Sequence, residues 1–372
     1  MRRWKLLLLG LFALSGAAQA AIVIGQSVPL TGVASGYGKG LAEGAAAYFN
    51  TLNSKGGING EEVRFISYDD AFDTQRTLAN TRKLIDKDKA VALLGYYGED
   101  AVIELMSHRW LEGAGIPLVG VASGVRMIRV PGSPNVFHSR ASQRDEIAKM
   151  VTQMHGLGID KIGVFYQDDG FGREGLDAAK EAAKANNMQI TVQASYLTNK
   201  LDMKAAAEKM ANANPPAILM ISITKPAGAF IKELREAGCG SVLYHTSTVD
   251  FEQLVKDIGA GTAHGLAIAQ VYPYAWDSRN KLIREFRQAM QDYDANATIS
   301  YAALEGYINA KLLSDAIKRA GSGSDRAKVL AALTNLGEVD YQGFHVTFGP
   351  NRREGSKFVD LTIVNVKGEL SR

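Results

Sequence analysis

One stretch near the N-terminus has the residue pattern of a nicotinamide-dependent enzyme. Residues 31–38 match the Thr-Gly-x-x-x-Gly-x-Gly loop with which dehydrogenases hold a dinucleotide, and Tyr307 with Lys311 forms a Tyr-x-x-x-Lys pair of the kind that transfers a proton. The two motifs are much further apart in the sequence than the length of one dinucleotide-binding domain allows. A Tyr and a Lys four residues apart are also common in amphipathic helices. A Rossmann-type enzyme is therefore only a remote alternative.

The other common catalytic and metal-binding motifs are missing from the sequence. It has no G-x-S-x-G or H-E-x-x-H motif, its six histidines are scattered, and its single cysteine rules out a cysteine pair as metal ligands. The acidic pairs Asp69-Asp70 and Asp168-Asp169 follow predicted strands and have the chemistry of an acid and a base. Turn formation and helix capping explain such pairs more often. We predict no catalytic residue, no metal and no cofactor.

What remains is a set of glycines, hydroxyl residues and aromatic residues that follow predicted strands. Glycines allow backbone N–H groups to approach a ligand, hydroxyl groups fix its polar end, and aromatic rings cover its apolar part. This chemistry binds a molecule and does not break its bonds. The set consists of Tyr37, Tyr96, Tyr97, Gly98, Ser123, Gly124, Phe171, Thr224 and Ser247.

Two similar strand–loop–helix units are expected to position the aromatic members of this set. A strand from residue 22 is followed by a flexible, glycine-rich loop with Tyr37 and by an alanine-rich helix over 41–50. The run 161–185 repeats this order, with Phe171 in the loop. Ligands of parallel sheets lie beyond the carboxyl ends of the strands, so both rings are expected to face one cleft between two lobes. The alternative is that each ring packs against the start of its own helix.

Strand and helix patterns alternate along the whole chain, which is typical of parallel, doubly wound sheets. A chain of this length fits two domains of ordinary size. Because the first half has too few helices to cover its own sheet, each lobe needs segments from separate parts of the chain. The predicted crossings lie near Arg140, Gln270 and Lys357. One lobe then combines residues 21–139 with 271–357, and the other combines 140–270 with 358–372.

The first twenty residues have the features of a secretory signal peptide. Arg2, Arg3 and Lys5 precede an apolar run over 6–14, and Ala18-Gln19-Ala20 is an A-x-A cleavage site. The apolar run is too short to span a bilayer, and no later stretch is long enough. We expect an exported protein without stable membrane insertion, whose mature chain begins at residue 21.

The charge balance argues against a nucleic-acid partner. The full chain has 42 Lys and Arg residues against 39 Asp and Glu residues, and three of the basic residues belong to the predicted signal peptide. The mature chain then has 39 of each and a formal net charge of zero. A protein that binds nucleic acid normally has a basic footprint. With one cysteine, an internal disulfide is excluded.

Six short motifs follow one another along the chain: VPLTG at 28–32, Tyr37-Gly38, GGING at 56–60, Asp69-Asp70, GAGIPLVG at 113–120 and FGREG at 171–175. Taken in this order, they resemble the periplasmic Leu/Ile/Val-binding proteins of ABC importers and their amide- and urea-binding relatives. The resemblance implies a type I periplasmic-binding-protein fold, an α/β structure of two doubly wound, Rossmann-like lobes with a three-segment hinge and a cleft that closes on ligand. It also implies a periplasmic monomer that delivers a small polar ligand, above all an amino acid, to permease subunits.

The same resemblance implies roles for individual residues. Tyr37 matches an aromatic residue that covers the ligand, Ser123 a hydroxyl residue that holds its carboxylate, and Phe171 a position where many members have Tyr. Thr224 also stands where some members have Tyr. Ser247 stands where the family commonly has the acidic residue that binds the ammonium group.

Glu99 is the main departure from the family pattern. The loop in which the family has Ser or Thr for the carboxylate reads Gly98-Glu99-Asp100 here. Either Glu99, or less readily Asp100, binds the ammonium of an amino acid, or the ligand has no ammonium and Glu99 is solvated at the rim. A sensor of amides or small carboxylates is the alternative function. The predicted ligand-binding residues are Tyr37, Tyr97, Gly98, Glu99, Ser123, Gly124, Phe171, Thr224 and Ser247.

Overall fold

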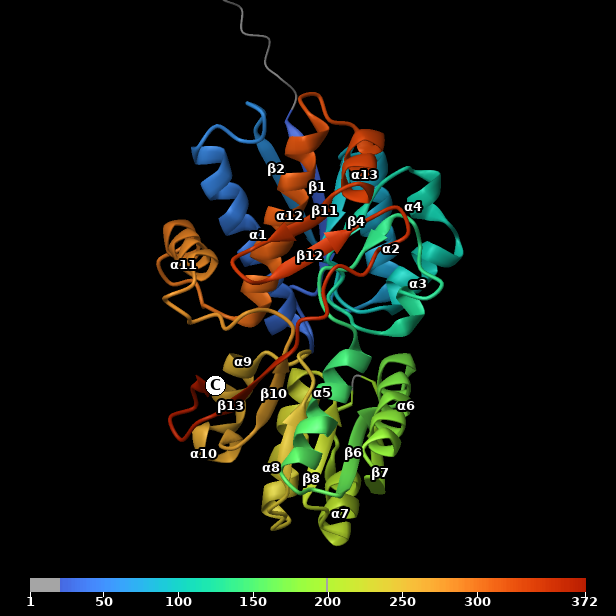
Figure 1. Cartoon of the computed structure of the whole chain (residues 1–372), viewed down its shortest axis with the longest axis vertical. Helices are drawn as coiled ribbons and strands as arrows, with labels where there is room; N and C mark the ends of the chain where they lie inside the picture. Colours follow the sequence, from blue (N-terminus) through green and yellow to red (C-terminus); the bar gives the residue numbers. More distant parts are fainter. Residues whose placement is uncertain (1–20, 199) are drawn as a thin grey trace, which may run out of the picture.

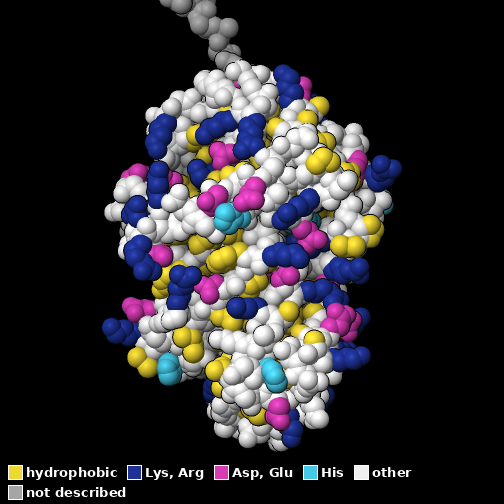
Figure 2. Space-filling view, viewed as in Figure 1, with side chains coloured by type: hydrophobic (Ala, Val, Ile, Leu, Met, Phe, Trp, Pro, Cys, Tyr) yellow, Lys and Arg dark blue, Asp and Glu magenta, His cyan; other side chains and the backbone are white. Residues whose placement is uncertain are grey.

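The computed structural model describes residues 21–198 and 200–372, which form two α/β lobes, one above the other in Figure 1. The predicted signal peptide, 1–20, lies outside the described residues. Within the described part of the chain, no helix is long and apolar enough to cross a membrane. On the face shown in Figure 2, Lys and Arg side chains are interspersed with Asp and Glu side chains and do not form one basic patch.

The first lobe is built on a five-stranded parallel sheet in the order β2-β1-β3-β4-β5. Every residue of β1 is buried, as expected for a strand that is covered on both faces. The strands are β1 (Ile22–Val28), β2 (Val63–Asp69), β3 (Ala92–Leu94), β4 (Leu118–Val119) and β5 (Val136–Phe137). The helices are α1 (Ser35–Ser54), α2 (Thr74–Asp86), α3 (Asp100–Ser107), α4 (Trp110–Gly113), the 3₁₀ turn η1 (Arg126–Ile128), α11 (Lys281–Tyr293), α12 (Tyr301–Ala320) and α13 (Arg326–Thr334).

The second lobe is built on a seven-stranded sheet in the order β14-β13-β10-β9-β8-β6-β7. The strands are β6 (Lys161–Gln167), β7 (Gln189–Tyr196), β8 (Ala217–Ile221), β9 (Val242–His245), β10 (Ala267–Gln270), β13 (Asp360–Val364) and β14 (Leu370–Ser371). The helices are α5 (Gln143–Gly156), α6 (Gly170–Ala185), α7 (Lys204–Ala213), α8 (Thr224–Glu236), α9 (Phe251–Ile258) and α10 (Ala260–Ala263).

The expectation of purely parallel sheets is wrong for the last strands of the chain. β13 runs antiparallel to β10, and β14 runs antiparallel to β13. A tight turn at Gly368, which has a positive φ of 79°, joins these two strands without the long crossover that a parallel pair requires. β12 (His345–Phe348) likewise lies outside both large sheets, because it pairs with β11 (Gly337–Asp340) in a separate hairpin.

Three segments connect the lobes. The chain leaves the first sheet after β5, returns from the second after β10, and enters the second again with β13 (Figure 1). The segment after β5 is the most deeply buried of the three at its centre, because Arg140 has no exposed surface.

Two long helices of the first lobe, α1 and α12, pack so closely that their backbones are in contact. A Cβ atom added to Gly44 of α1 would lie 1.8 Å from the carbonyl oxygen of Ala303, and one added to Gly306 of α12 would lie 2.1 Å from that of Leu41. Only glycine permits such an approach. The core of the first lobe therefore depends on residues 301–320, late in the chain.

The predicted loop over 31–40 is wrong in its second half, because α1 already begins at Ser35. Glycine lowers helix propensity, but here the glycines permit close packing: a Cβ on Gly38 would lie 2.1 Å from the carbonyl oxygen of Pro29. Tyr37 is thus a residue of the first helical turn. At Arg109, a left-handed backbone with φ of 53° separates α3 from α4.

Candidate functional site

A cavity of about 270 Å³ lies between the two lobes, at the carboxyl ends of the strands. Both lobes contribute to its wall. The first lobe contributes among others Asp70, Phe72, Asp73, Tyr97, Gly98, Glu99, Asp100, Ala101 and Ser123, and the second contributes Gln167, Asp169, Phe171, Thr198, Ile223 and Thr248.

The wall of this cavity is acidic. It contains no Lys, Arg or His among the described residues, but five carboxyl groups. Three aspartates among them have roles in turns or caps: Asp70 accepts from the Ser27 hydroxyl and from the amide of Phe72, Asp73 caps α2, and Asp169 caps α6 by accepting from the amide of Gly172 at 3.1 Å. The interpretation of the acidic pairs as turn and cap residues is therefore confirmed for Asp70 and Asp169, although both also line the cavity.

Glu99 lies in the wall of the cavity and not at a solvated rim. Its residue is 8 % exposed, and its Oε2 accepts from the Ser123 hydroxyl at 3.0 Å. Burial, together with the negative charges of Asp100 and Asp169, raises the pKa of the Glu99 carboxyl to about 8. The interpretation of Glu99 as solvated at the rim is wrong, because its side chain at the N-cap of α3 is buried and accepts from Ser123.

The first turn of α3 has no side-chain cap. Glu99 occupies the N-cap position but turns its carboxyl group to Ser123, so it accepts no hydrogen bond from the helix. Ala101, in that first turn, lines the cavity. The uncapped N–H groups of a helix start, together with the helix dipole, favour an anionic group nearby.

Five of the nine predicted ligand-binding residues line the cavity: Tyr97, Gly98, Glu99, Ser123 and Phe171. The Tyr97 ring packs between two others, with its centroid 5.5 Å from that of Phe72 and 5.3 Å from that of Tyr37.

Tyr37 and Gly124 do not line the cavity. Tyr37 lies behind Tyr97 and donates its hydroxyl to Glu305 at 2.7 Å, so in this arrangement it supports the wall without forming it. The carbonyl oxygen of Gly124 accepts from the amide of Gln143. A Cβ on Gly124 would lie 2.5 Å from that amide nitrogen, so this glycine is needed for packing against the start of α5.

Thr224 and Ser247 are also outside the cavity. Thr224 begins α8, and its hydroxyl accepts from the amide of Asp250 at 3.0 Å. Ser247 is buried deeper between the lobes, where its amide donates to Glu146 at 2.7 Å and its hydroxyl contacts Arg140. Both hydroxyl groups already have protein partners.

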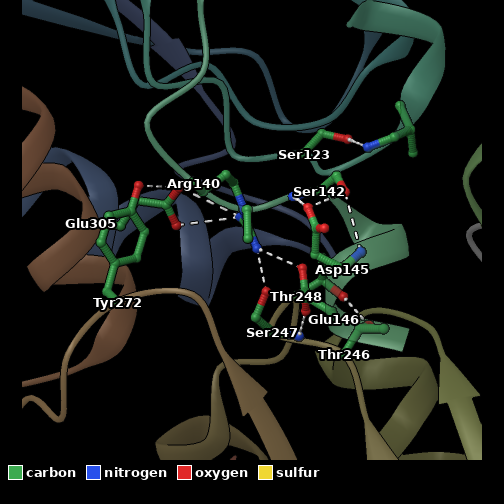
Figure 3. Close-up of polar contacts among 12 residues, drawn as sticks. Ser123, Arg140, Ser142, Asp145, Glu146, Thr246, Ser247, Thr248, Tyr272 and Glu305 are labelled. Carbon is green, nitrogen blue, oxygen red and sulfur yellow. Dashed lines mark hydrogen bonds and ion pairs between the residues drawn. The ribbon is translucent and has the colours of Figure 1, made fainter. Parts of the chain in front are cut away.

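Sequence reasoning missed a buried charge cluster around Arg140, shown in Figure 3. Nη1 of Arg140 lies 3.4 Å from a carboxylate oxygen of Glu305, and Nη2 lies 3.5 Å from one of Glu146. Tyr272 donates its hydroxyl to Glu305 at 3.3 Å. Glu305 comes from α12 of the first lobe, whereas Glu146 and Ser247 belong to the second. Arg140 therefore joins both lobes at the first crossing.

The local sequence explains how Glu146 reaches Arg140. Ser142 and Asp145 form a capping box at the start of α5, which fixes the first turn of the helix directly after the crossing. Burial raises the pKa of the carboxyls of Glu146 and Glu305, an effect that the guanidinium opposes. For Arg140, burial lowers the pKa, but the combined attraction of Glu305 and the groups around it outweighs burial, so the net shift is upward.

The Tyr-x-x-x-Lys pair lies in the helix core of the first lobe. Tyr307 packs edge-on against Tyr48, with ring centroids 5.1 Å apart. Among the described residues, no group of His, Cys, Asp and Glu has an arrangement that could hold a metal ion.

Ser123→Ala is expected to raise the pKa of Glu99 above that of the parent protein. The Ser123 hydroxyl stabilises the ionised carboxylate, so its loss favours the protonated form. Denaturant unfolding of the unliganded protein across a pH series measures this, because the pH at which stability is lost should move upward. A midpoint that stays in place or falls would contradict the assigned hydrogen bond.

Comparison with known proteins agrees with this architecture. The periplasmic binding protein profile matches residues 21–369. The crystal structure of a substrate-binding periplasmic protein from Ralstonia solanacearum is 36 % identical, with a TM-score of 0.89, and the match covers 94 % of this chain and 99 % of that chain. That of a possible leucine/isoleucine/valine-binding protein from Rhodopirellula baltica SH 1 is 26 % identical, with a TM-score of 0.87 and coverage of 95 % and 97 %.

A third match is the Leu/Ile/Val-binding protein homolog 8 of Brucella abortus (strain 2308), which is 24 % identical over 95 % of this chain and 92 % of its own length. The expected resemblance and the two-lobed α/β fold are thereby confirmed. The family consists of ligand-binding proteins of the periplasm and not of enzymes. Because its profile spans nearly all of the described residues, this chain belongs to the periplasmic binding protein family.

Proposed function

We propose that this protein captures an amino acid, or a closely related small solute, between its lobes and delivers it to the permease subunits of an ABC importer. The observation that carries the proposal is the cavity between the lobes, in which a buried carboxyl group lies beside an uncapped helix start. The names of the Brucella and Rhodopirellula relatives, which refer to leucine, isoleucine and valine, support the amino-acid class.

The wall of the cavity fits the parts of an amino acid. An ammonium group needs a buried anion, because an unpaired buried charge is very costly, and Glu99 is positioned to supply it. The N–H groups in the first turn of α3 suit the carboxylate. The rings of Phe72, Tyr97 and Phe171 suit an apolar side chain. Ser247 has no part in this arrangement, since its hydroxyl contacts Arg140 and its amide donates to Glu146.

Closure of two lobes around the ligand provides the burial that a small ligand needs for tight binding. A micromolar dissociation constant corresponds to about 8 kcal/mol. For a ligand of roughly nine heavy atoms this is about 0.9 kcal/mol per atom, near the upper limit for small ligands, so nearly all of the ligand must be buried. We propose that residues 21–139 with 271–357 move as one lobe and 140–270 with 358–372 as the other.

The proposed capture predicts that a bound solute makes the protein more compact. Thermal-shift screening against amino acids, amides and small carboxylates identifies the solute, and small-angle scattering then compares the free and saturated protein. We expect a smaller radius of gyration at saturation and recovery of the solute unchanged. A radius that does not change at saturation would contradict the closing cleft, and chemical conversion of the solute would contradict the binding role.

Delivery to an importer is tested in cells. A strain that lacks this protein should lose uptake of the labelled solute, and the intact protein supplied in trans should restore it. Unchanged uptake in the deletion strain, with a behavioural response to the solute lost instead, would favour a sensor.

A further inference from the structure

Carboxyl groups of both lobes converge on one part of the cavity. Glu99 and Asp100 belong to the start of α3 in the first lobe, and Asp169 belongs to the start of α6 in the second. All three line the cavity. The charge of Asp169 acts across the gap, since it raises the pKa of both Glu99 and Asp100.

No protein cation balances these groups along the described cavity wall. The other titratable groups on the wall are Asp70, Asp73 and Tyr97, none of which carries a positive charge. Among the other described residues, Ser123 is the hydrogen-bond partner of the Glu99 side chain; it donates to Oε2, and no other residue donates to Oε1. A carboxyl group that is more than nine-tenths buried thus has an acceptor available at the cavity.

A neutral zwitterion would balance only part of the negative charge of these carboxyl groups. Its ammonium neutralises one carboxylate, but its own carboxylate adds a further negative charge to the same small space. Like charges at close range repel by several kcal/mol in a partly buried site, on the order of 4 kcal/mol at 4 Å. An additional positive group would turn this repulsion between the lobes into attraction.

We propose that the cleft is built for a solute with a net positive charge, whose cationic group lies between Glu99 and Asp100 of the first lobe and Asp169 of the second. This proposal rests on the proposed function and specifies its solute class: small amines and guanidines, including basic amino acids. The aromatic residues Phe72, Tyr97 and Phe171 cover the methylene chain of such a solute. The cation then links the two lobes, and an anionic solute is rejected.

Binding of such a cation is expected to release a proton. Near pH 7 the Glu99 carboxyl, whose pKa is raised to about 8, is largely protonated in the free protein. A cation beside it favours the ionised form and lowers that pKa. Affinity should therefore rise with pH between about 6 and 8, up to about tenfold for each pH unit below the pKa of the free protein.

The test uses solute pairs of matched size that differ in charge. L-arginine is compared with L-citrulline, L-lysine with L-norleucine, and agmatine and putrescine report on cations without a carboxylate. Isothermal titration calorimetry of the parent protein at pH 7, in two buffers with different ionisation enthalpies, gives the affinity and the number of protons released. We expect the cationic member of at least one pair to bind at least about tenfold more tightly, a difference of about 1.4 kcal/mol, with proton release.

Two matched variants separate the effect of the Asp169 charge from the effect of its capping of α6. Asp169→Asn keeps a side chain that caps α6, since Asn is also a good N-cap, but removes the charge. Asp168→Asn is the control, because Asp168 is the adjacent aspartate and pairs with Arg173 outside the cavity. We expect Asp169→Asn to reduce the preference for the cationic member about tenfold or more, as one lost charge pair of roughly 1.4 kcal/mol requires. Asp168→Asn should retain that preference.

The outcomes distinguish this inference from the proposed function. Tight binding of neutral or anionic solutes, with no preference for a cation, would overturn the inference and leave solute capture intact. Equal preference in Asp169→Asn and the parent would overturn the bridging position of the cation. If no amino acid, amine, amide or carboxylate binds to the folded protein, the proposed function fails and the inference fails with it.

Discussion

Arg140→Met is expected to lower the free energy of unfolding by about 3–5 kcal/mol, the usual effect of removing one partner from a buried ion pair. Arg140 has no exposed surface and lies between the carboxyl groups of Glu305 and Glu146. Without the guanidinium, two buried carboxyl groups of different lobes would face each other with no cation between them. Urea unfolding at pH 7, followed by circular dichroism, measures the loss.

A control and a rescue make this prediction specific. Arg173→Met removes an exposed arginine that pairs with Asp168, and it should leave stability unchanged. Adding Glu146→Gln and Glu305→Gln to Arg140→Met removes the unpaired charges and should recover part of the loss. A loss for Arg140→Met as small as that for Arg173→Met would show that the cluster contributes little to the joining of the lobes.

Glu99→Gln is expected to stabilise the unliganded protein at pH 8 and above. The pKa of Glu99 is about 8 in the folded state against an ordinary value of 4.5, so the folded state binds the proton more tightly. The contribution of this group to stability is therefore present below about pH 4.5 and is lost as the pH rises to about 8. One pKa unit corresponds to about 1.4 kcal/mol, so the difference between parent and variant at pH 8 reaches up to about 4 kcal/mol.

The same variant is expected to lose amino-acid binding, because a neutral amide cannot pair with the buried ammonium. Glu104→Gln is the matched control, since Glu104 is a half-exposed carboxylate of the same helix and does not line the cavity. Unfolding is followed from pH 4.5 to 9, and binding is measured by calorimetry with the amino acid that gives the largest thermal shift. If Glu99→Gln binds that amino acid as tightly as the parent, Glu99 has no role with the ammonium.

Local patterns in the sequence predicted much of the fold. The parallel strands are short apolar runs, and they alternate with helices along the chain as predicted. The start of α1 was not predictable in this way, because glycines that suggest a loop serve instead to bring α1 against Pro29 and α12. Tertiary packing thus overrides a local propensity.

The sequence predicted only those residues of the site that lie in a loop directly after a strand. Glu99 and Ser123 each follow a strand, and both line the cavity. The Arg140 cluster has no local signal, because its members come from the first crossing, α5, the loop after β9 and α12. The raised pKa of Glu99 also depends on the second lobe, because the charge of Asp169, many residues away in the chain, contributes to it.

The close packing of α1 against α12 has a consequence for the order in which the protein folds. The parallel part of the second lobe is formed by one continuous segment, from α5 to β10, so its contacts close short loops. The first lobe must bring α12 back to α1 across that whole segment, and closing a long loop is entropically less favourable and slower. We expect the second lobe to acquire hydrogen-exchange protection first during refolding. The apolar face of α1 stays uncovered until residues 301–320 pack against it. In this interval the first sheet lacks its cover, and this is the stage at which the folding chain is most prone to aggregation.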